Sequence, residues 1–354
     1  MRTKIKTCLV VILILLISGF TNENKFAEGV AAFKAQDYKT AITKFTVLAT
    51  NGHAHAQLYL AEMYKSGQGV SSDYDAGHAM MLSSAENGNA EAAYRLGLQH
   101  DRIFAEKDSL EKAIPWYEQA AKKGHKKALG RLAELYKIES GEFANKEKYL
   151  HWLHKAAEAN HADSMYELAF LYNNGTVIEA DHGEAIRLTK GAAKYGNAEA
   201  QFNLSRMYIE GRGVETNQDE AFKWLIWSAS NKWPPALHQL GIVYLQRQGA
   251  TVQDIEKGLN AIEEACEQDY MPAHMTMSEI HGLGVGVEKD LQTALSWVYV
   301  AKENGLKDPD KIIAKVISIY EIPSSVHHEA RKQARRCLNS EYRVCMSNPP
   351  HLMH

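Results

Sequence analysis

Residues 197–232 read NAEAQFNLSRMYIEGRGVETNQDEAFKWLIWSASNK, and this stretch holds one complete copy of the unit that decides the fold. Corresponding copies recur along two thirds of the chain. They end 36 residues apart, with a single step of 37. So constant a period predicts a solenoid, in which one structural unit is copied and stacked. The residues that close the copies are Gly52, Gly88, Gly124, Asn160, Gly196, Lys232, Asp269 and Gly305.

The first half of each copy predicts a helix with one packed face, which we name helix A. In residues 197–232 the large side chains Leu204 and Tyr208 lie among the small residues Ala200 and Ser205. Their offsets from Gly196 are 4, 8, 9 and 12, which follow one face of an α-helix. Small residues among large ones let a second helix approach closely.

The second half predicts a turn and then a second helix, helix B. Gly211 and Gly213 suit the turn, because glycine adopts positive φ without strain. The closing residue is expected in the left-handed region, as a helix C-terminal residue. An acid or amide before helix B can cap it, and these caps are expected at Asp73, Asp108, Asn145, Asp181, Asn217, Asp254 and Asp290. The packing column of helix B is expected eight residues before the closing residue, at Met80, Trp116, Trp152, Leu188, Trp224 and Trp297.

Three copies depart from the pattern, the third because Tyr149 stands where a small residue is usual. The second lacks the glycine turn and carries Pro115, which we expect in the first turn of helix B, where proline is tolerated. The sixth opens with Trp233-Pro234-Pro235 directly after Lys232. There we predict a local change in superhelix curvature, at residues 230–236.

The combined pattern resembles the Sel1-like repeat, a relative of the tetratricopeptide repeat. The resemblance covers about four fifths of the chain and implies an all-α, right-handed α-solenoid of stacked antiparallel helix pairs. As to function, it implies protein–protein contact. The predicted organisation is a signal peptide or N-terminal anchor at 1–21, an abbreviated helical repeat at 24–52, seven repeats over 53–305 (53–88, 89–124, 125–160, 161–196, 197–232, 233–269 and 270–305), capping helices at 306–345 and a disordered tail at 346–354.

The N-terminus predicts export. Arg2, Lys4 and Lys6 precede a short apolar run at residues 8–17, which is typical of a secretory signal. The protein is therefore expected to be periplasmic or secreted. The alternative is an uncleaved leader that anchors it in the inner membrane, facing the periplasm. A net charge of −3 predicts no broad attraction to nucleic acid.

The cysteines agree with an oxidising compartment. Cys337 and Cys345 are close enough in sequence to form a disulfide across a small loop. Cys266 stands where other copies carry alanine, so we expect a small buried residue there.

Three patterns raise the question of catalysis or ligand binding. Ser109 and Lys112 have the Ser-x-x-Lys spacing of penicillin-recognising enzymes, but the chain lacks the partner motifs of such a site. The glycines of residues 282–286 align with the turn of the other copies, and His151 and His154 have no companion at ligand spacing. We therefore expect no catalytic, cofactor or metal site. An envelope hydrolase of β-lactamase type, or a peptidoglycan-binding module, is the alternative.

The outer face of helix A is the candidate binding surface. It lies at offsets of 3, 7, 10 and 14 from each closing residue, where apolar side chains stand among arginines and glutamates. Such a composition is typical of a recognition groove. We therefore expect a non-catalytic exported scaffold that binds protein partners through this concave surface, in cell-envelope assembly or regulation or in host contact. The candidate contact residues are Tyr59, Arg95, Leu98, Arg102, Arg131, Ile138, Phe170, Arg206 and Ile242.

Overall fold

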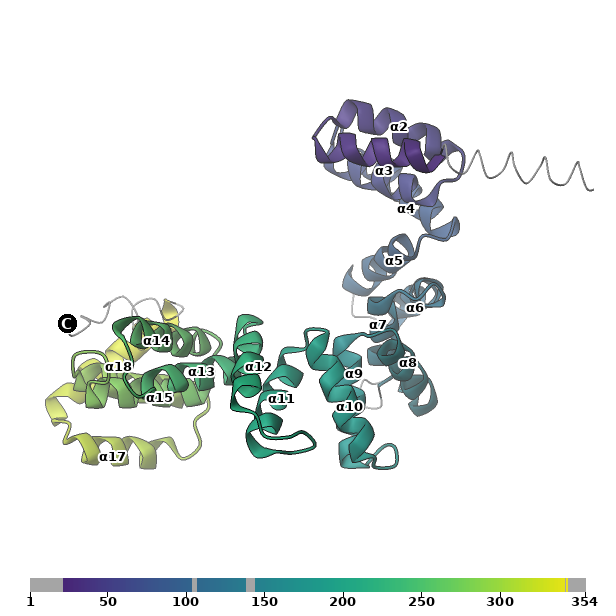
Figure 1. Ribbon diagram of the computed structural model, residues 1–354. Helices are drawn as coiled ribbons and strands as arrows, with labels where there is room; N and C mark the ends of the chain where they lie inside the picture. The colour runs from purple at the N-terminus through teal and green to yellow at the C-terminus, as the bar shows by residue number, and fades with distance from the viewer. Residues whose placement is uncertain (1–21, 104–106, 138–143, 341, 343–354) are drawn as a thin grey trace, which may run out of the picture. The chain divides into compact units, whose positions relative to one another are not determined.

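The computed structural model describes residues 22–103, 107–137, 144–340 and 342, and for residues 102, 103, 107 and 108 it describes the backbone alone. Within these ranges the chain is all helical, and no strand occurs. It divides into two compact units, Met1–Met165 and Tyr166–His354 (Figure 1). The predicted leader at 1–21 and the predicted tail at 346–354 lie outside the described residues.

In the first unit, successive helices pack each against the next. Residues 22–34 form the first described helix. The following helices are α2 (Tyr38–Thr50), α3 (Ala54–Ser66), α4 (Tyr74–Glu86), α5 (Ala90–Ile103), α6 (Lys107–Lys122), α7 (Lys126–Tyr136) and α8 (Lys146–Glu158), and the unit ends inside α9 (Ala162–Asn174).

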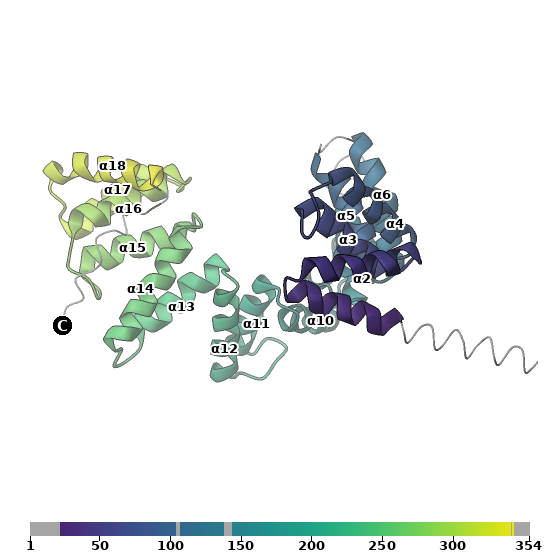
Figure 2. The same cartoon turned by 90° about the horizontal axis from the view of Figure 1, so that it is seen from above.

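In the second unit, helices A and B also follow one another along the chain and pack against each other (Figure 2). After the rest of α9 it contains α10 (His182–Lys194), α11 (Ala198–Glu210), α12 (Gln218–Ser230), α13 (Pro234–Gln246), α14 (Val252–Cys266), α15 (Met271–Leu283), α16 (Leu291–Glu303), α17 (Pro309–Tyr320) and α18 (Ser324–Asn339).

The closing residues confirm the expected backbone conformation. All eight have positive φ, including the three that are not glycine: Asn160 at 60°, Lys232 at 61° and Asp269 at 56°. At the first seven the chain reverses from helix B into the next helix A, and Gly305 leads into α17. The period in the sequence is therefore the spacing of left-handed residues.

The caps of helix B are confirmed at five positions and corrected at one. The side chains of Asp73, Asn145, Asp181, Asn217 and Asp290 each accept a backbone N–H of the first turn. In the sixth copy the N-cap is Thr251, and Asp254 completes a reciprocal capping box with it. The helix therefore starts three residues before the position that the acid suggested. Asp108 lies within α6, and its side chain is not described.

One other expectation about helix B is wrong, and another holds only in part. Pro115 lies in the interior of α6, because that helix already begins at Lys107. The packing column is confirmed at Leu188 and Trp297, which are buried eight residues before the closing residue. In three other copies the buried residue lies seven before it: Tyr117, Leu153 and Leu225 are buried, whereas the preceding Trp116, Trp152 and Trp224 are half-buried. A step of one residue turns a side chain by about 100° around the helix. The buried side chain is therefore the one that turns toward helix A.

The last repeat is covered by two additional helices. Both α17 and α18 pack against α16, and α16 is buried at every position from Thr293 to Ala301. Residues Ala330, Ala334 and Cys337 of α18 are buried as well. A charged final helix thus shields the apolar end of the stack from water.

Among the described helices, none is both long and apolar enough to cross a bilayer. The predicted change of curvature at residues 230–236 stays a prediction, although Pro234 and Pro235 do open α13.

Candidate partner-binding face of helix A

In the first unit the predicted face forms an open groove of about 790 Å³. We name it the N-terminal groove. It combines side chains from the first described helix and from three successive copies, the third of which contributes His125 before α7. Two predicted contact residues, Tyr59 and Arg95, lie in its wall. Its lining consists of Phe33, His55, Leu58, Tyr59, Glu62, Ser66, Gln68, Asn89, Ala90, Glu91, Arg95 and His125.

Tyr59 belongs to an aromatic cluster beneath the groove. Its ring stacks on Phe45, with centroids 4.8 Å apart and planes 20° apart. The ring of Phe33 meets it edge-on at 5.3 Å, and that of Phe26 at 5.8 Å. Phe45 itself is fully buried. Tyr59 therefore fixes the shape of the groove and exposes only part of its ring.

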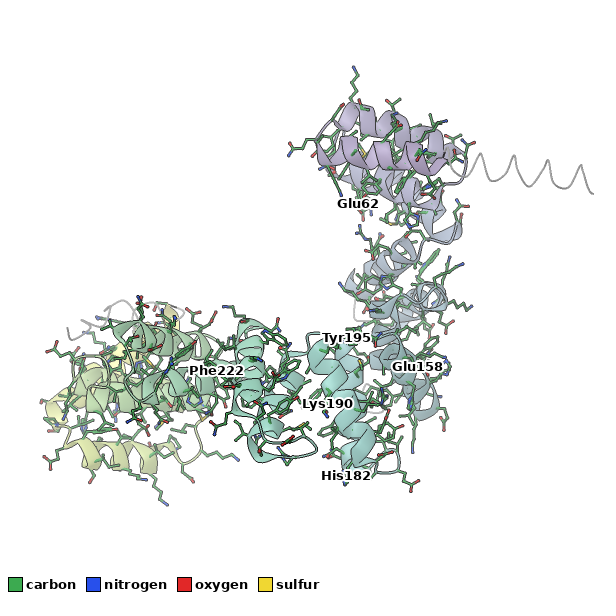
Figure 3. The ribbon with its side chains drawn as sticks, in the orientation of Figure 1. Glu62, Glu158, His182, Lys190, Tyr195 and Phe222 are labelled. Carbon is green, nitrogen blue, oxygen red and sulfur yellow. The ribbon has the colours of Figure 1, made fainter. Side chains whose placement is uncertain are left out.

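A line of charges crosses the groove from α3 to α7. Arg95 donates from Nη1 to Glu62 Oε1 and from Nε to Glu91 Oε1, both at 2.6 Å. The other oxygen of Glu91 lies 3.0 Å from Nε2 of His125. Burial opposes ionisation of Glu91, but the hydrogen bonds from Arg95 and His125 outweigh it and lower the pKa of this carboxyl. Figure 3 labels Glu62, at the α3 end of this line.

Arg131 is similarly paired inside the molecule. It donates to both oxygens of Asp101, at 2.7 and 2.8 Å, and to Glu134 at 2.8 Å. The hydroxyl of Tyr117 also donates to Asp101, at 2.6 Å. Burial raises the pKa of Tyr117, and its bond to Asp101 adds to this rise. The predicted charged rim thus links successive copies to one another.

The histidines that follow the closing residues have a role that sequence reasoning missed. His53, His125 and His161 are N-caps of helix A, because Nδ1 of each accepts the backbone N–H three residues on. Asn89 and Asn197 make the same bond in other copies. The available signal was that histidine or asparagine follows the closing residue in five copies, at His53, Asn89, His125, His161 and Asn197.

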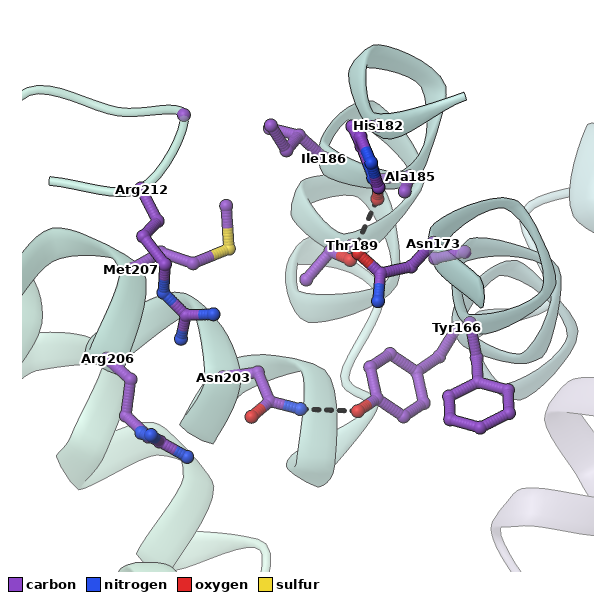
Figure 4. Close-up of a pocket in the computed structure, with 13 residues that line it drawn as sticks. Tyr166, Asn173, His182, Ala185, Ile186, Thr189, Asn203, Arg206, Met207 and Arg212 are labelled. Atoms are coloured by element: carbon purple, nitrogen blue, oxygen red, sulfur yellow. Dashed lines mark hydrogen bonds between the residues drawn. The ribbon is translucent and has the colours of Figure 1, made fainter. Parts of the chain in front are cut away.

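A second hollow lies in the second unit, and we name it the central pocket (Figure 4). Its volume is about 380 Å³, and α9, α10, α11 and the turn after α11 form its walls. Two predicted contact residues, Phe170 and Arg206, line it, together with Tyr166, Ala169, Asn173, His182, Ala185, Ile186, Thr189, Asn203, Met207, Arg212 and Gly213.

Tyr166 is held at the base of the central pocket by two polar partners. Its hydroxyl accepts from Nδ2 of Asn203 and donates to Glu199 at 3.2 Å. Burial and the nearby charge of Glu199 raise the pKa of Tyr166 to about 12. The phenol therefore stays protonated at neutral pH.

The other predicted contact residues lie elsewhere. Leu98 and Ile242 are half-buried and line neither hollow. The side chain of Arg102, and Ile138 as a whole, lie outside the described residues. The structure thus gathers four of the nine candidates into two separate hollows.

The cysteine predictions are partly addressed. Cys266 is buried and free, and burial raises the pKa of its thiol. Cys337 is buried and disulfide-bonded. Cys345 lies outside the described residues, so its pairing with Cys337 stays a prediction.

The patterns that suggested chemistry occupy structural positions. Gly284 and Gly286 have φ of 77° and 71°, and Gly284 is the left-handed C-cap of α15. Ser109 and Lys112 lie in the first half of α6. No group of three or more His, Cys, Asp or Glu residues in the described part of the chain is arranged to hold a metal ion.

Comparison with known proteins gives these helix pairs a family. The Sel1 repeat model matches residues 54–89, 90–125, 126–161, 162–197, 198–231, 234–270 and 273–306. The chain belongs to the Sel1 repeat family. Members of this family are in general non-catalytic scaffolds for protein–protein interaction.

Solved structures include two Sel1 repeat proteins with a similar fold. A Sel1 repeat protein from Oxalobacter formigenes is 26% identical, with a TM-score of 0.54, over 68% of this chain and 96% of that one. A protective antigen of uropathogenic Escherichia coli strains, which displays an SLR fold, is 22% identical, with a TM-score of 0.53, over 94% of this chain and 80% of that one. The second likeness concerns the fold alone. No curated protein matches the chain.

Proposed function

We propose that this Sel1 repeat protein is an exported scaffold that binds a protein partner along the helix A face, with the N-terminal groove as its main docking point. The observation that carries the proposal is the groove of about 790 Å³, whose walls come from successive copies and are cross-linked by Arg95, Glu91 and His125. A wall held by such bonds is preformed. Binding then costs little ordering entropy.

Two observations support the exported location. Arg2, Lys4 and Lys6 precede an apolar run of the length of a secretory signal. Cys337 is disulfide-bonded, and disulfides are rare in the cytosol of most cells. The roles that fit such a scaffold are cell-envelope assembly, regulation of an envelope protein, or contact with a host.

Filling the groove tests the docking role. Ser66 lines the groove and is exposed, so Ser66→Trp places a large ring there with little disturbance of the core. Val47 on α2 is 52% exposed and does not line the groove, which makes Val47→Trp the matched control. Partners captured by cross-linking in envelope extract are identified. Each partner is then purified, and its affinity for the natural protein and the two variants is measured by calorimetry. We expect Ser66→Trp to weaken binding at least about tenfold, roughly the loss of one good contact. Equal affinity for the two folded variants would remove the groove from the proposal.

Export is tested separately. Residues 1–25 are fused to alkaline phosphatase, a reporter that becomes active only outside the cytoplasm. We expect activity, and we expect its loss when Leu13→Arg and Leu15→Arg interrupt the apolar run. An inactive fusion carrying the natural residues would refute export through this segment.

A further inference from the structure

The lining of the central pocket is basic, although the chain has a formal net charge of −3. Two arginines, Arg206 and Arg212, line it, and no carboxylate does. Both arginines bond to Glu210, outside the lining: Arg206 Nη2 at 3.3 Å and Arg212 Nε at 2.5 Å. The two guanidinium groups share this one carboxylate, while the other nearby carboxylate, Glu199, is bonded to Tyr166. The two arginine side chains are 51% and 60% exposed, so their remaining N–H groups are within reach of a ligand.

The same pocket exposes an aromatic surface. Phe170 is 57% exposed, so its ring is available to a ligand. In Figure 4 the arginines lie across the hollow from Tyr166, with Asn203 between them. Asn203 donates to Tyr166 through Nδ2, and its carbonyl oxygen remains as an acceptor for a ligand N–H.

We propose that the central pocket binds an acidic peptide segment, with a carboxylate on Arg206 and Arg212 and a neighbouring apolar side chain on Phe170. The inference rests on the proposed function, since it supplies one chemical class of partner for the same face. Arginine binds carboxylates through paired, charge-assisted hydrogen bonds, and the amide of Asn203 suits a peptide N–H. A free phosphate would use the arginines and leave Phe170 without a contact. The volume of about 380 Å³ holds a few side chains, not a folded domain.

Peptide display on the full chain tests this proposal without a known partner. Random peptides are selected on the natural protein and on the double variant Arg206→Gln, Arg212→Gln. The matched control is Arg187→Gln, because Arg187 on α10 is exposed and paired with Glu184 but does not line the pocket. Thermal unfolding followed by circular dichroism verifies that each variant is folded. An enriched peptide is then titrated at low and high salt, together with its copy in which glutamine replaces glutamate.

We expect the enriched peptides to carry Asp or Glu next to an aromatic or aliphatic residue. The double variant should weaken their binding at least about tenfold, since charge-assisted bonds are among the stronger hydrogen bonds, and Arg187→Gln should leave it unchanged. Enrichment of neutral peptides, no enrichment, or equal binding by the double variant would overturn the proposal. So would preferential binding of peptidoglycan fragments, or self-association of the chain that the double variant abolishes. Ser66→Trp should not affect these peptides, so failure here is distinguishable from failure of the N-terminal groove.

Discussion

Glu263 on α14 is a carboxylate whose titration is expected to affect stability. Burial raises its pKa to about 7, and the neighbouring Glu267 adds to the rise. In the unfolded chain its pKa is the ordinary 4.5. Between these two values the folded state binds more protons than the unfolded state, so the free energy of unfolding falls as pH rises. This contribution is fully present below pH 4.5 and lost above about pH 7.

Glu263→Gln should remove that loss. We expect the variant and the natural protein to be equally stable near pH 4.5. The variant should become more stable by on the order of 2 kcal/mol above pH 7, and the gain should grow steadily between these pH values. Urea unfolding at several pH values measures the free energy of unfolding of both proteins. In the difference between the two free energies, the contributions of the other titrating groups cancel.

Glu256→Gln is the control on the same helix, because Glu256 is exposed. It should change stability little at any pH. A gain from Glu263→Gln that does not depend on pH would contradict the assignment, since it would reflect packing rather than ionisation.

At the residue scale the sequence predicted backbone conformation better than side-chain chemistry. Position in the period alone placed Lys232 and Asp269 in the left-handed region, although neither is glycine. It did not predict that His125 caps α7. A histidine Nδ1 accepts an N–H only in one tautomer, and the residue type alone does not indicate which tautomer is present.

At the element scale, the cap of α7 has a testable energetic role. His125 Nδ1 accepts from Ala128 N at 3.2 Å, and its Nε2 contacts Glu91. His125→Ala removes both interactions and should lower the free energy of unfolding by about 1 kcal/mol, the usual effect of losing a cap. His125→Asn should retain most of the stability, because Asn197 makes the same bond at 2.7 Å. Thermal and urea unfolding provide the measurement. If alanine and asparagine are equally destabilising, the contact with Glu91 matters rather than the cap.

The errors at the element scale have a common cause. The sequence analysis placed the start of helix B at the nearest suitable residue. In the structure, α14 begins at the reciprocal capping pair of Thr251 and Asp254, and α6 begins at Lys107, so that Pro115 lies in its interior. A cap is a competition between adjacent residues, and tertiary packing contributes to its outcome. Helix identity was therefore predictable, and helix boundaries were less so.

At the scale of the whole molecule, the period was sufficient to predict the fold class. Every copy has the same spacing, so every copy can bury its apolar side chains against its neighbours in the same way. The candidate face was predicted only in part. Arg95 lines the N-terminal groove, as expected of a contact residue, but Arg95 and Arg131 also join successive copies, through Glu62 and Asp101 respectively. Pairing between copies depends on the stacking geometry, which the spacing of residues within one copy does not contain.

A substitution in the last helix tests whether each copy is stabilised mainly by the copies next to it. Ala334 on α18 is 2% exposed and packs in the layer that covers α16. Ala334→Glu buries a charge there and should destabilise this end by about 3 kcal/mol or more. In a linear stack each copy is stabilised mainly by its neighbours. Hydrogen exchange should therefore accelerate most in α16 and α18, less in α14, and little in α11.

The control is Arg335→Glu, which changes the adjacent exposed residue and should leave the exchange pattern intact. Uniform acceleration from α10 to α18 in the Ala334 variant would mean that the second unit unfolds as one cooperative body, not as a stack of separate copies.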